Sequence, residues 1–239
     1  MSADKTAGAV LTIAIVGAES TGKTTLAAAL AQRLAADTGL RVAWVPEVLR
    51  QWCARTGRTP RVHEQASILR AQHERIDAAA ATHDLVVCDT TALMTAVYSR
   101  LVFGDRTLDE RAAALHRRAV STTLLTALDL PWVGDGLQRD GPHVREPVDN
   151  ALRELMHAHG VAFSVVGGPG ELRLAQAMTA VRPLLRDLAG VARPAGRRTG
   201  LFTGLLGSAA QAAPDDRAWS CECCLPDQER ALIRQRQAQ

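Results

Sequence analysis

The sequence predicts an α/β fold, with helices on both faces of a doubly wound, mostly parallel sheet of five strands. Three observations favour this fold. Apolar runs of strand length alternate with longer segments whose apolar residues recur at helical spacing. The runs are continuously apolar, as expected for parallel strands that are buried on both faces. Finally, 47 % of the 239 residues are hydrophobic, enough to cover such a sheet.

The first strand is expected over residues 11–16, a short and mainly apolar run. The helix that follows is expected over residues 25–36. Its residues Leu26, Leu30 and Leu34 lie four positions apart and therefore share one helical face.

The second strand, residues 41–45, ends before Pro46 and Glu47. Helices are expected over residues 48–55 and 62–81, because a loop that contains Gly and Pro separates two segments of helical pattern.

The third strand is expected over residues 84–88 and ends at Asp89. Helices over residues 92–102 and 108–119 follow, separated by a short turn that contains Gly and Asp.

The fourth strand is expected over residues 121–128, and a polar segment, residues 134–146, follows it. A helix over residues 147–159 begins with proline, which the first helical turn tolerates because its N–H would be unpaired anyway. The fifth strand, residues 161–166, ends at a Gly-Gly-Pro-Gly turn, and the last helix covers residues 171–188.

The domain limits follow from the same pattern. Residues 1–10 are expected to be an N-terminal tail and residues 11–189 the domain. Residues 190–239 change to a Gly-, Ala- and Arg-rich composition, which predicts a weakly structured linker and C-terminal extension. The extension carries Cys221, Cys223 and Cys224; since a zinc site needs four ligands and no second pair is in view, ordinary thiols are favoured.

Composition argues against several classes of protein. The formal net charge is +3 and the arginines are scattered, which disfavours a nucleic-acid partner. No apolar stretch reaches the length of a membrane span, and the polar start disfavours a signal peptide. Five cysteines without a secretion signal predict a cytoplasmic protein. The sequence does not indicate an oligomeric state.

The segment Gly-Ala-Glu-Ser-Thr-Gly-Lys-Thr, residues 17–24, is a complete phosphate-binding loop between the first strand and its helix. Backbone N–H groups of such a loop surround the phosphates, the lysine reaches the β- and γ-phosphates, and the last hydroxyl ligates Mg²⁺. The sequence therefore predicts a P-loop NTPase, and ATP is favoured because no guanine-reading Asn/Thr-Lys-x-Asp sequence follows the fourth strand. The residues expected to bind the nucleotide are Gly17, Glu19, Ser20, Thr21, Gly22, Lys23, Thr24 and Thr25.

Two carboxylates are expected at the carboxyl edge of the sheet, where ligands of parallel sheets bind. Asp89 would hold Mg²⁺ together with Thr24, although Asp89 or Thr90 could instead cap a helix. Glu47 follows the second strand, which adjoins the first in many sheets of this type. Its carboxylate could therefore accept a proton from an attacking hydroxyl or hydrogen-bond a sugar. The alternative for Glu47 is a charge in the first turn of a helix. Arg50 could pair with Glu47 or bind substrate.

The polar segment 134–146 is expected to be a mobile lid that excludes water and supplies positive charge for phosphoryl transfer. Arg139 and Arg145 are the candidates for that charge, with Arg106 a weaker third, and a solvated surface position is the alternative for each.

Four motifs resemble, in residues and in order, the nicotinamide riboside kinase domain of NadR-type proteins. They are residues 17–24, Pro46-Glu47-x-x-Arg50, Cys88-Asp89-Thr90-Thr91-x-x-Met94-Thr95 and Trp132-Val133-x-Asp135-Gly136-Leu137. The resemblance covers about residues 11–188.

The resemblance implies ATP-dependent phosphorylation of the 5′-hydroxyl of nicotinamide riboside. Lys23 and Thr24 would serve ATP and Mg²⁺, and Asp89 the metal. Glu47 and Arg50 would lie on the riboside side, while Asp135 and Arg139 would lie at the lid. The family's ring-stacking aromatics are replaced by Pro46 and Thr59-Pro60, so Trp52 or Tyr98 would have to substitute.

Two hypotheses follow. The first is a small-molecule kinase that acts on a nucleoside. The second is a nucleotide-dependent switch or regulator in which ATP acts through a protein partner.

Overall fold

The computed structural model describes residues 10–133 and 141–188. The chain divides into two units, Met1–Val191 and Ala192–Gln239, and every described residue belongs to the first. Residues 1–9 of the predicted N-terminal tail and the whole predicted C-terminal extension, with Cys221, Cys223 and Cys224, lie outside the described residues.

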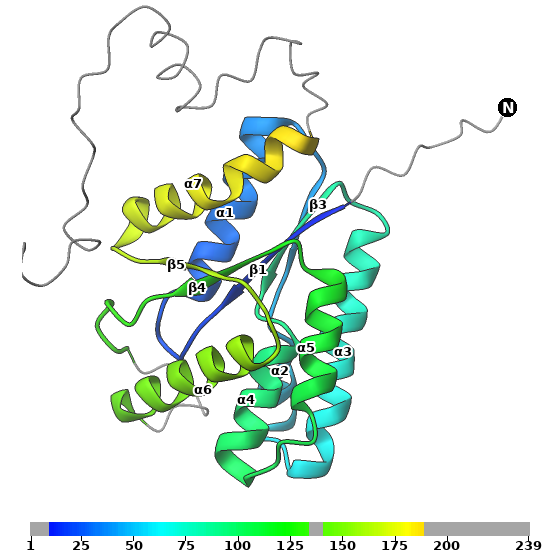
Figure 1. The fold of residues 1–239 in the computed structure, drawn as a ribbon, viewed down its shortest axis with the longest axis vertical. Coiled ribbons are helices and arrows are strands. Elements are labelled where there is room, and N and C mark those ends of the chain that lie inside the picture. The colour runs from blue at the N-terminus through cyan, green and yellow to red at the C-terminus, as the bar shows by residue number, and fades with distance from the viewer. Residues whose placement is uncertain (1–9, 134–140, 189–239) are drawn as a thin grey trace, which may run out of the picture. The chain divides into compact units, whose positions relative to one another are not determined.

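A five-stranded parallel sheet forms the centre of the first unit, in the order β2-β3-β1-β4-β5 (Figure 1). All four strand pairs are parallel, which confirms the predicted fold class. The strands are β1 (Leu11–Val16), β2 (Val42–Val45), β3 (Leu85–Asp89), β4 (Thr122–Thr126) and β5 (Ser164–Val166).

Helices cover both faces of the sheet. They are α1 (Lys23–Thr38), α2 (Val48–Thr56), α3 (Val62–Ala80), α4 (Ala92–Phe103), α5 (Asp109–Ala119), α6 (Arg145–Ala158) and α7 (Gly170–Leu188), with a 3₁₀ turn η1 (Pro142–Val144) before α6. One apolar cluster joins β1 to α1 and α7, and another joins the opposite face to α4, α5 and α6 (Figure 1). The sheet is thus the middle of three layers.

The strand order corrects one expectation. β2 does not adjoin β1, because β3 lies between them and pairs with both. Hydrophobic runs show where strands begin and end, but they do not say which strands pair. Glu47 follows β2, so the strand that ends at Asp89 lies between Glu47 and the strand that leads into the phosphate-binding loop.

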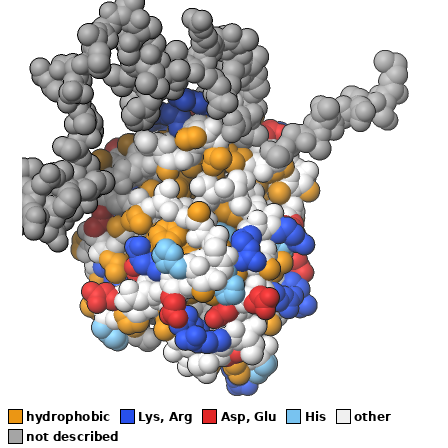
Figure 2. Space-filling model, in the orientation of Figure 1, with side chains coloured by type: hydrophobic (Ala, Val, Ile, Leu, Met, Phe, Trp, Pro, Cys, Tyr) orange, Lys and Arg blue, Asp and Glu red, His pale blue; other side chains and the backbone are white. Residues whose placement is uncertain are grey.

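The predicted boundaries lie within three residues of the observed ones. The main differences are that β4 and β5 are shorter than expected and that α6 begins at Arg145 rather than at residue 147. None of the helices within residues 10–133 and 141–188 is long and apolar enough to span a membrane. On the face seen in Figure 2, basic and acidic side chains are interspersed over the described surface.

Candidate nucleotide and acceptor site

The loop between β1 and α1 has the backbone that a phosphate-binding loop requires. Gly17 has φ 148°, Gly22 has φ 78°, and Ser20 is in the left-handed region at φ 55°. Glycine is required at the first position because a Cβ on Gly17 would collide with the Thr126 hydroxyl of β4.

Hydrogen bonds fix the phosphate-binding loop to itself and to the ends of β1 and β4. The Thr21 hydroxyl donates to the Ala18 carbonyl (2.8 Å) and lies 2.6 Å from Thr126 Oγ1. Thr126 Oγ1 in turn donates to the Val16 carbonyl at the end of β1. The first turn of α1 contains no acidic side chain, and its N-cap, Gly22, offers no capping side chain. The first N–H groups of α1 are therefore left for an anion, as expected at a helix N-terminus that binds phosphate.

Lys23 is the basic group of this loop and is buried. Its Nζ donates to the Ala18 carbonyl at 2.7 Å. Burial lowers the pKa of Lys23, while the nearby carboxylates of Glu47, Asp89 and Glu19 oppose that shift. The lysine thus lies among three acidic side chains.

Asp89, at the end of β3, fits a magnesium ligand. Thr24 Oγ1 donates to Asp89 Oδ2 at 2.6 Å. Asp89 is 1 % exposed, and no atom of the described residues hydrogen-bonds its Oδ1. A hydroxyl and a carboxylate in contact, with one buried carboxylate oxygen left over, are the oxygen donors that Mg²⁺ prefers.

The cap of α4 is Thr91, whose Oγ1 accepts from the Leu93 N–H, so the alternative in which Asp89 or Thr90 caps this helix is wrong. Thr90 instead has φ 72°, a rare conformation for a β-branched residue. Its N–H donates to the Ile15 carbonyl. Behind it, His116 bridges Thr91 (2.9 Å) and Thr123 (2.8 Å). These bonds fix the backbone that directly follows Asp89.

Glu47 occupies the N-cap position of α2, but its side chain makes no capping hydrogen bond. The carboxylate is buried, and Arg50 Nε lies 3.4 Å from its Oε2. Burial raises the pKa of Glu47; the charge of Lys23 opposes this shift and that of Asp89 adds to it. The structure therefore brings Glu47 together with Lys23 and Asp89, and a carboxyl of raised pKa is suited to receive a proton.

Glu19 and Tyr98 extend this acidic side of the site. Glu19 Oε2 is buried, and no described atom hydrogen-bonds it. Tyr98 on α4 has a raised pKa, mainly because it is buried and also because of the Glu19 and Glu47 carboxylates. Trp52 is the other aromatic expected to replace the stacking rings. The guanidinium carbon of Arg58 lies over its ring, 4.9 Å from the ring centroid.

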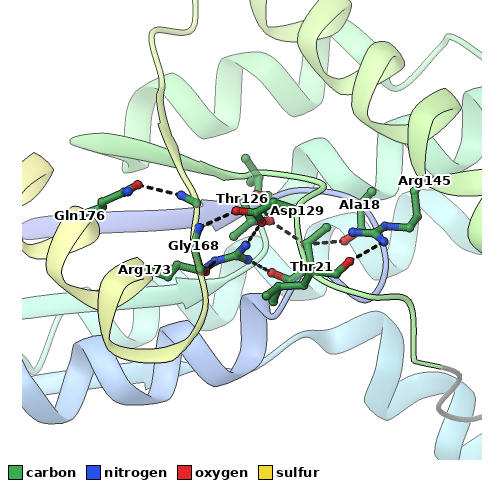
Figure 3. Close-up of polar contacts among 11 residues, drawn as sticks. Ala18, Thr21, Thr126, Asp129, Arg145, Gly168, Arg173 and Gln176 are labelled. Atoms are coloured by element: carbon green, nitrogen blue, oxygen red, sulfur yellow. Dashed lines mark hydrogen bonds and ion pairs between the residues drawn. The ribbon is translucent and has the colours of Figure 1, made fainter.

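The residues predicted to act from the lid lie in different surroundings, and some lie outside the described residues. Asp135 and Arg139 lie outside the described residues. Arg145 is the first residue of α6 rather than part of a loop, and it is buried. Its Nη1 donates to the Leu130 carbonyl at 2.8 Å, while within the described residues Nε and Nη2 find no acceptor (Figure 3). Arg106 is exposed in the turn before α5.

The remaining loop positions are Ser20 and Thr25. The Ser20 hydroxyl donates to the Val133 carbonyl (3.0 Å) and accepts from the Val133 N–H (2.8 Å), which ties the loop to the segment after β4. Thr25 is exposed in the first turn of α1.

Sequence reasoning missed Arg173 and Asp129. Arg173 is buried on α7 and donates to the carbonyl of Thr21 in the phosphate-binding loop and to the Asp129 carboxylate (Figure 3). Asp129 could have been noticed, since it follows the fourth strand at the ligand-binding edge. Arg173 had no local signal, because an arginine in an amphipathic helix resembles a surface residue.

Comparisons with known proteins agree with this geometry. The family model described as "AAA domain" matches residues 12–173. No curated protein matches the chain.

Many solved structures share the fold, and three serve as examples. Two are NadR structures, one in complex with NAD and AMP-PNP (18 % identity, TM-score 0.59, 73 % of this chain and 49 % of that chain) and one in complex with NR (19 %, 0.57, 73 % and 50 %). The third is thymidylate kinase from Ehrlichia chaffeensis (15 %, 0.52, 74 % and 100 %). The chain spans about half the length of the NadR chains that it resembles.

Proposed function

This chain belongs to the AAA domain family, and from that premise we propose that it is an ATP-dependent small-molecule kinase. It transfers the γ-phosphate of ATP to the 5′-hydroxyl of a nucleoside such as nicotinamide riboside. The observation that carries the proposal is Glu47, a buried carboxylate of raised pKa grouped with Lys23 and Asp89 beside the phosphate-binding loop. A protein that only binds a nucleotide needs no proton acceptor there, whereas hydrolysis would use the same carboxylate on water. Acceptor-dependent ADP release therefore distinguishes a kinase from an ATPase.

Each residue of the group has one role in the proposed reaction. The N–H groups of the phosphate-binding loop and of the first turn of α1 bind the phosphates, and Lys23 Nζ leaves the Ala18 carbonyl to reach the β- and γ-phosphates. Thr24 and Asp89 would hold Mg²⁺, which would offset the charge of the β- and γ-phosphates. Glu47 accepts the proton of the acceptor hydroxyl, and Arg50 keeps the Glu47 carboxylate oriented. Within the described residues, Nε and Nη2 of Arg145 have no acceptor and are available to bind the transferred group.

The solved relatives support the nucleoside class without naming the acceptor. One NadR structure is a complex with AMP-PNP and another a complex with NR, and a thymidylate kinase shares the fold. Because identities of 15–19 % establish the fold alone, the nicotinamide riboside specificity rests on the sequence motifs around Glu47 and Asp89.

The test is coupled ADP release with Mg-ATP, scanned over nicotinamide riboside and the common nucleosides. A kinase shows release that depends on one acceptor, and a phosphorylated product of matching mass. Lys23→Ala is the negative control and should abolish the acceptor-dependent rate.

A nucleotide-dependent switch is the second candidate, favoured by the bonds between Ser20 of the phosphate-binding loop and the backbone of Val133. It requires slow hydrolysis that no acceptor stimulates. A flat response over the whole acceptor panel, with ATP bound, would favour the switch over the kinase.

A further inference from the structure

Arg173 is the one buried arginine of the described part of α7, and its guanidinium makes three different contacts. Nη1 donates to the carbonyl of Thr21, Nη2 donates to the Asp129 carboxylate, and Nε donates to the Gly168 carbonyl at 2.8 Å (Figure 3). A buried cation is costly unless it is paired and hydrogen-bonded, and here it is both. The side chain is therefore held in one orientation.

The contact with Thr21 has a consequence for the next residue. A trans peptide unit is planar, so its C=O and N–H point in opposite directions. The Thr21 carbonyl and the Gly22 N–H belong to the same unit. With the carbonyl held by Arg173 on one side, the Gly22 N–H is turned to the other side, away from the guanidinium. Gly22 is the N-cap of α1, where an N–H that faces the phosphates is needed.

Gly22 itself does not fix this peptide, because glycine adopts φ values of either sign readily. Its φ of 78° therefore needs support from neighbouring side chains. A Cβ at Gly22 would lie 3.1 Å from Leu130 Cδ1 and 3.6 Å from Arg173 Nη1, so both side chains pack closely against this glycine. This packing, together with the hydrogen bond to the Thr21 carbonyl, holds the peptide in one orientation.

Arg173 is in turn anchored by the turn that precedes α7. The Gly168 N–H donates to Asp129, and the Gly167 N–H donates to Gln176 Oε1 at 2.8 Å (Figure 3). Asp129 thus binds both the turn and the guanidinium. Hydrogen bonds thus join the ends of β4 and β5 and the start of α7 to one another beside the phosphate-binding loop.

We propose that Arg173 is a positioning residue for nucleotide binding, which orients the Thr21–Gly22 peptide so that its N–H faces the phosphates, and that Asp129 orients Arg173. The proposal rests on the nucleotide-binding part of the proposed function and is independent of the acceptor. Arg173 acts on the phosphates through the backbone of the loop rather than by touching them.

The experiment measures binding of Mg-ADP and of tripolyphosphate to the full chain by calorimetry. Arg173→Met removes all three hydrogen bonds while keeping an unbranched side chain, and Arg182→Ala, an exposed arginine on the same helix, is the control. We expect Arg173→Met to weaken both ligands about 10- to 100-fold, the range of one hydrogen bond to a charged group. Arg182→Ala should leave both affinities unchanged. In a ¹⁵N–¹H correlation spectrum, the chemical shift of the Gly22 amide should change when tripolyphosphate is added to the wild type. The change should be smaller in Arg173→Met.

Two milder variants keep the proposal testable if Arg173→Met does not fold. Asp129→Asn and Arg173→Lys each retain part of the contact set, and we expect about three- to tenfold weaker tripolyphosphate binding from each, since part of a charge-assisted contact is lost. Unchanged tripolyphosphate affinity in the folded variants, together with an unchanged Gly22 amide response, would overturn the role of Arg173. Failure of the wild type to bind either ligand would instead overturn nucleotide binding itself, and the positioning role with it.

Discussion

At the scale of single residues, the proposed phosphoryl transfer depends on Glu47. Replacing it by glutamine keeps the size of the side chain but removes the proton acceptor. We expect Glu47→Gln to lower acceptor-dependent turnover by about 10²- to 10⁴-fold, the usual contribution of a general base. The affinity for Mg-ATP should change by no more than about twofold, because binding of the phosphates needs the loop and not this carboxylate. Steady-state kinetics and calorimetry measure the two effects separately.

Glu74→Gln is the matched control, because Glu74 is an exposed glutamate on α3. It should leave turnover unchanged. Unchanged turnover in Glu47→Gln as well would reduce Glu47 to a structural residue at the start of α2.

The raised pKa of Glu47 predicts the pH dependence of the proposed reaction. A base works only when it is deprotonated, so turnover falls as the pH drops through its pKa. Because burial raises the pKa of Glu47 above its ordinary value of 4.5, the acid limb of the turnover profile should lie at a higher pH than an exposed glutamate would give. Turnover at saturating substrate, measured against pH, tests this. The residual rate of Glu47→Gln should lack that limb, and an identical limb in the variant would assign it to another group.

His116 makes a separate prediction about stability. Burial, helped by the nearby Arg117 charge, lowers the pKa of His116 from 6.5 to about 4. In the unfolded chain the histidine is protonated below about pH 6.5, whereas the folded protein takes up this proton only near pH 4. The free energy of unfolding therefore falls as the pH drops between these values, by at most about 1.4 kcal/mol per pH unit and roughly 3 kcal/mol in all.

Urea unfolding at pH 7 and pH 5 measures this loss. His116→Gln can still bridge Thr91 and Thr123 but cannot be protonated, so the difference between the two pH values should shrink. His63→Gln, at an exposed position of α3, is the control. An equal pH dependence in wild type and His116→Gln would show that other groups cause the acid sensitivity.

At this scale the sequence predicts residues whose type and spacing form a motif. Lys23, Thr24 and Asp89 lie together as expected, because each lies at the end of a strand or the start of a helix in a known pattern. Arg173 and Asp129 could not be predicted as a pair. Their contact joins positions 44 residues apart, and only the packing of α7 beside the loop brings them together.

At the scale of elements, the β1–loop–α1 unit depends on glycine at two positions with different surroundings. Gly17 has φ 148° and faces Thr126. Gly39, the C-cap of α1, has φ 68°, and a Cβ there would meet no described atom within 4 Å. We expect Gly17→Ala to lower the affinity for Mg-ADP at least about tenfold and to cost roughly 1–3 kcal/mol of stability. Gly39→Ala carries backbone strain alone, so it should cost about 1–2 kcal/mol and leave the affinity unchanged.

Calorimetry measures the ADP affinity of the two variants, and thermal unfolding measures their loss of stability. Equal loss of ADP affinity in both would mean that general destabilisation, and not the shape of the loop, controls binding.

The helices also show which boundaries the sequence pattern can predict and which it cannot. Helical periodicity predicted α1, α3 and α7 within a few residues, because each buries one long apolar face. The start of α6 was set too late because the proline at position 147 marked it, while Arg145 and the preceding 3₁₀ turn carry no apolar pattern. This error also assigned Arg145 to a mobile segment, although it is buried against the Leu130 carbonyl.

At the scale of the whole molecule, the fold class was predictable and the strand order was not. Continuous apolar runs require burial on both faces, and burial on both faces requires helices on each side. Nothing in those runs distinguishes β3 from β2 as the neighbour of β1. The position of β3 matters for function, because it brings Asp89 beside Thr24 and leaves Glu47 on the far side of Asp89.

The last prediction concerns how much of the chain the activity needs. The phosphate-binding loop, Glu47 and Asp89 all lie in the unit Met1–Val191, and so do the apolar clusters that enclose the sheet. We therefore expect a chain that ends after Val191 to keep the wild-type affinity for Mg-ADP within about twofold and to melt within a few degrees of the full chain, since no residue of those clusters is removed. Acceptor-dependent ADP release should persist if the protein is a kinase whose site is complete in this unit. Retained ADP binding with loss of the acceptor-dependent rate would show that residues 192–239 are needed for phosphoryl transfer and that the site is not complete in the first unit.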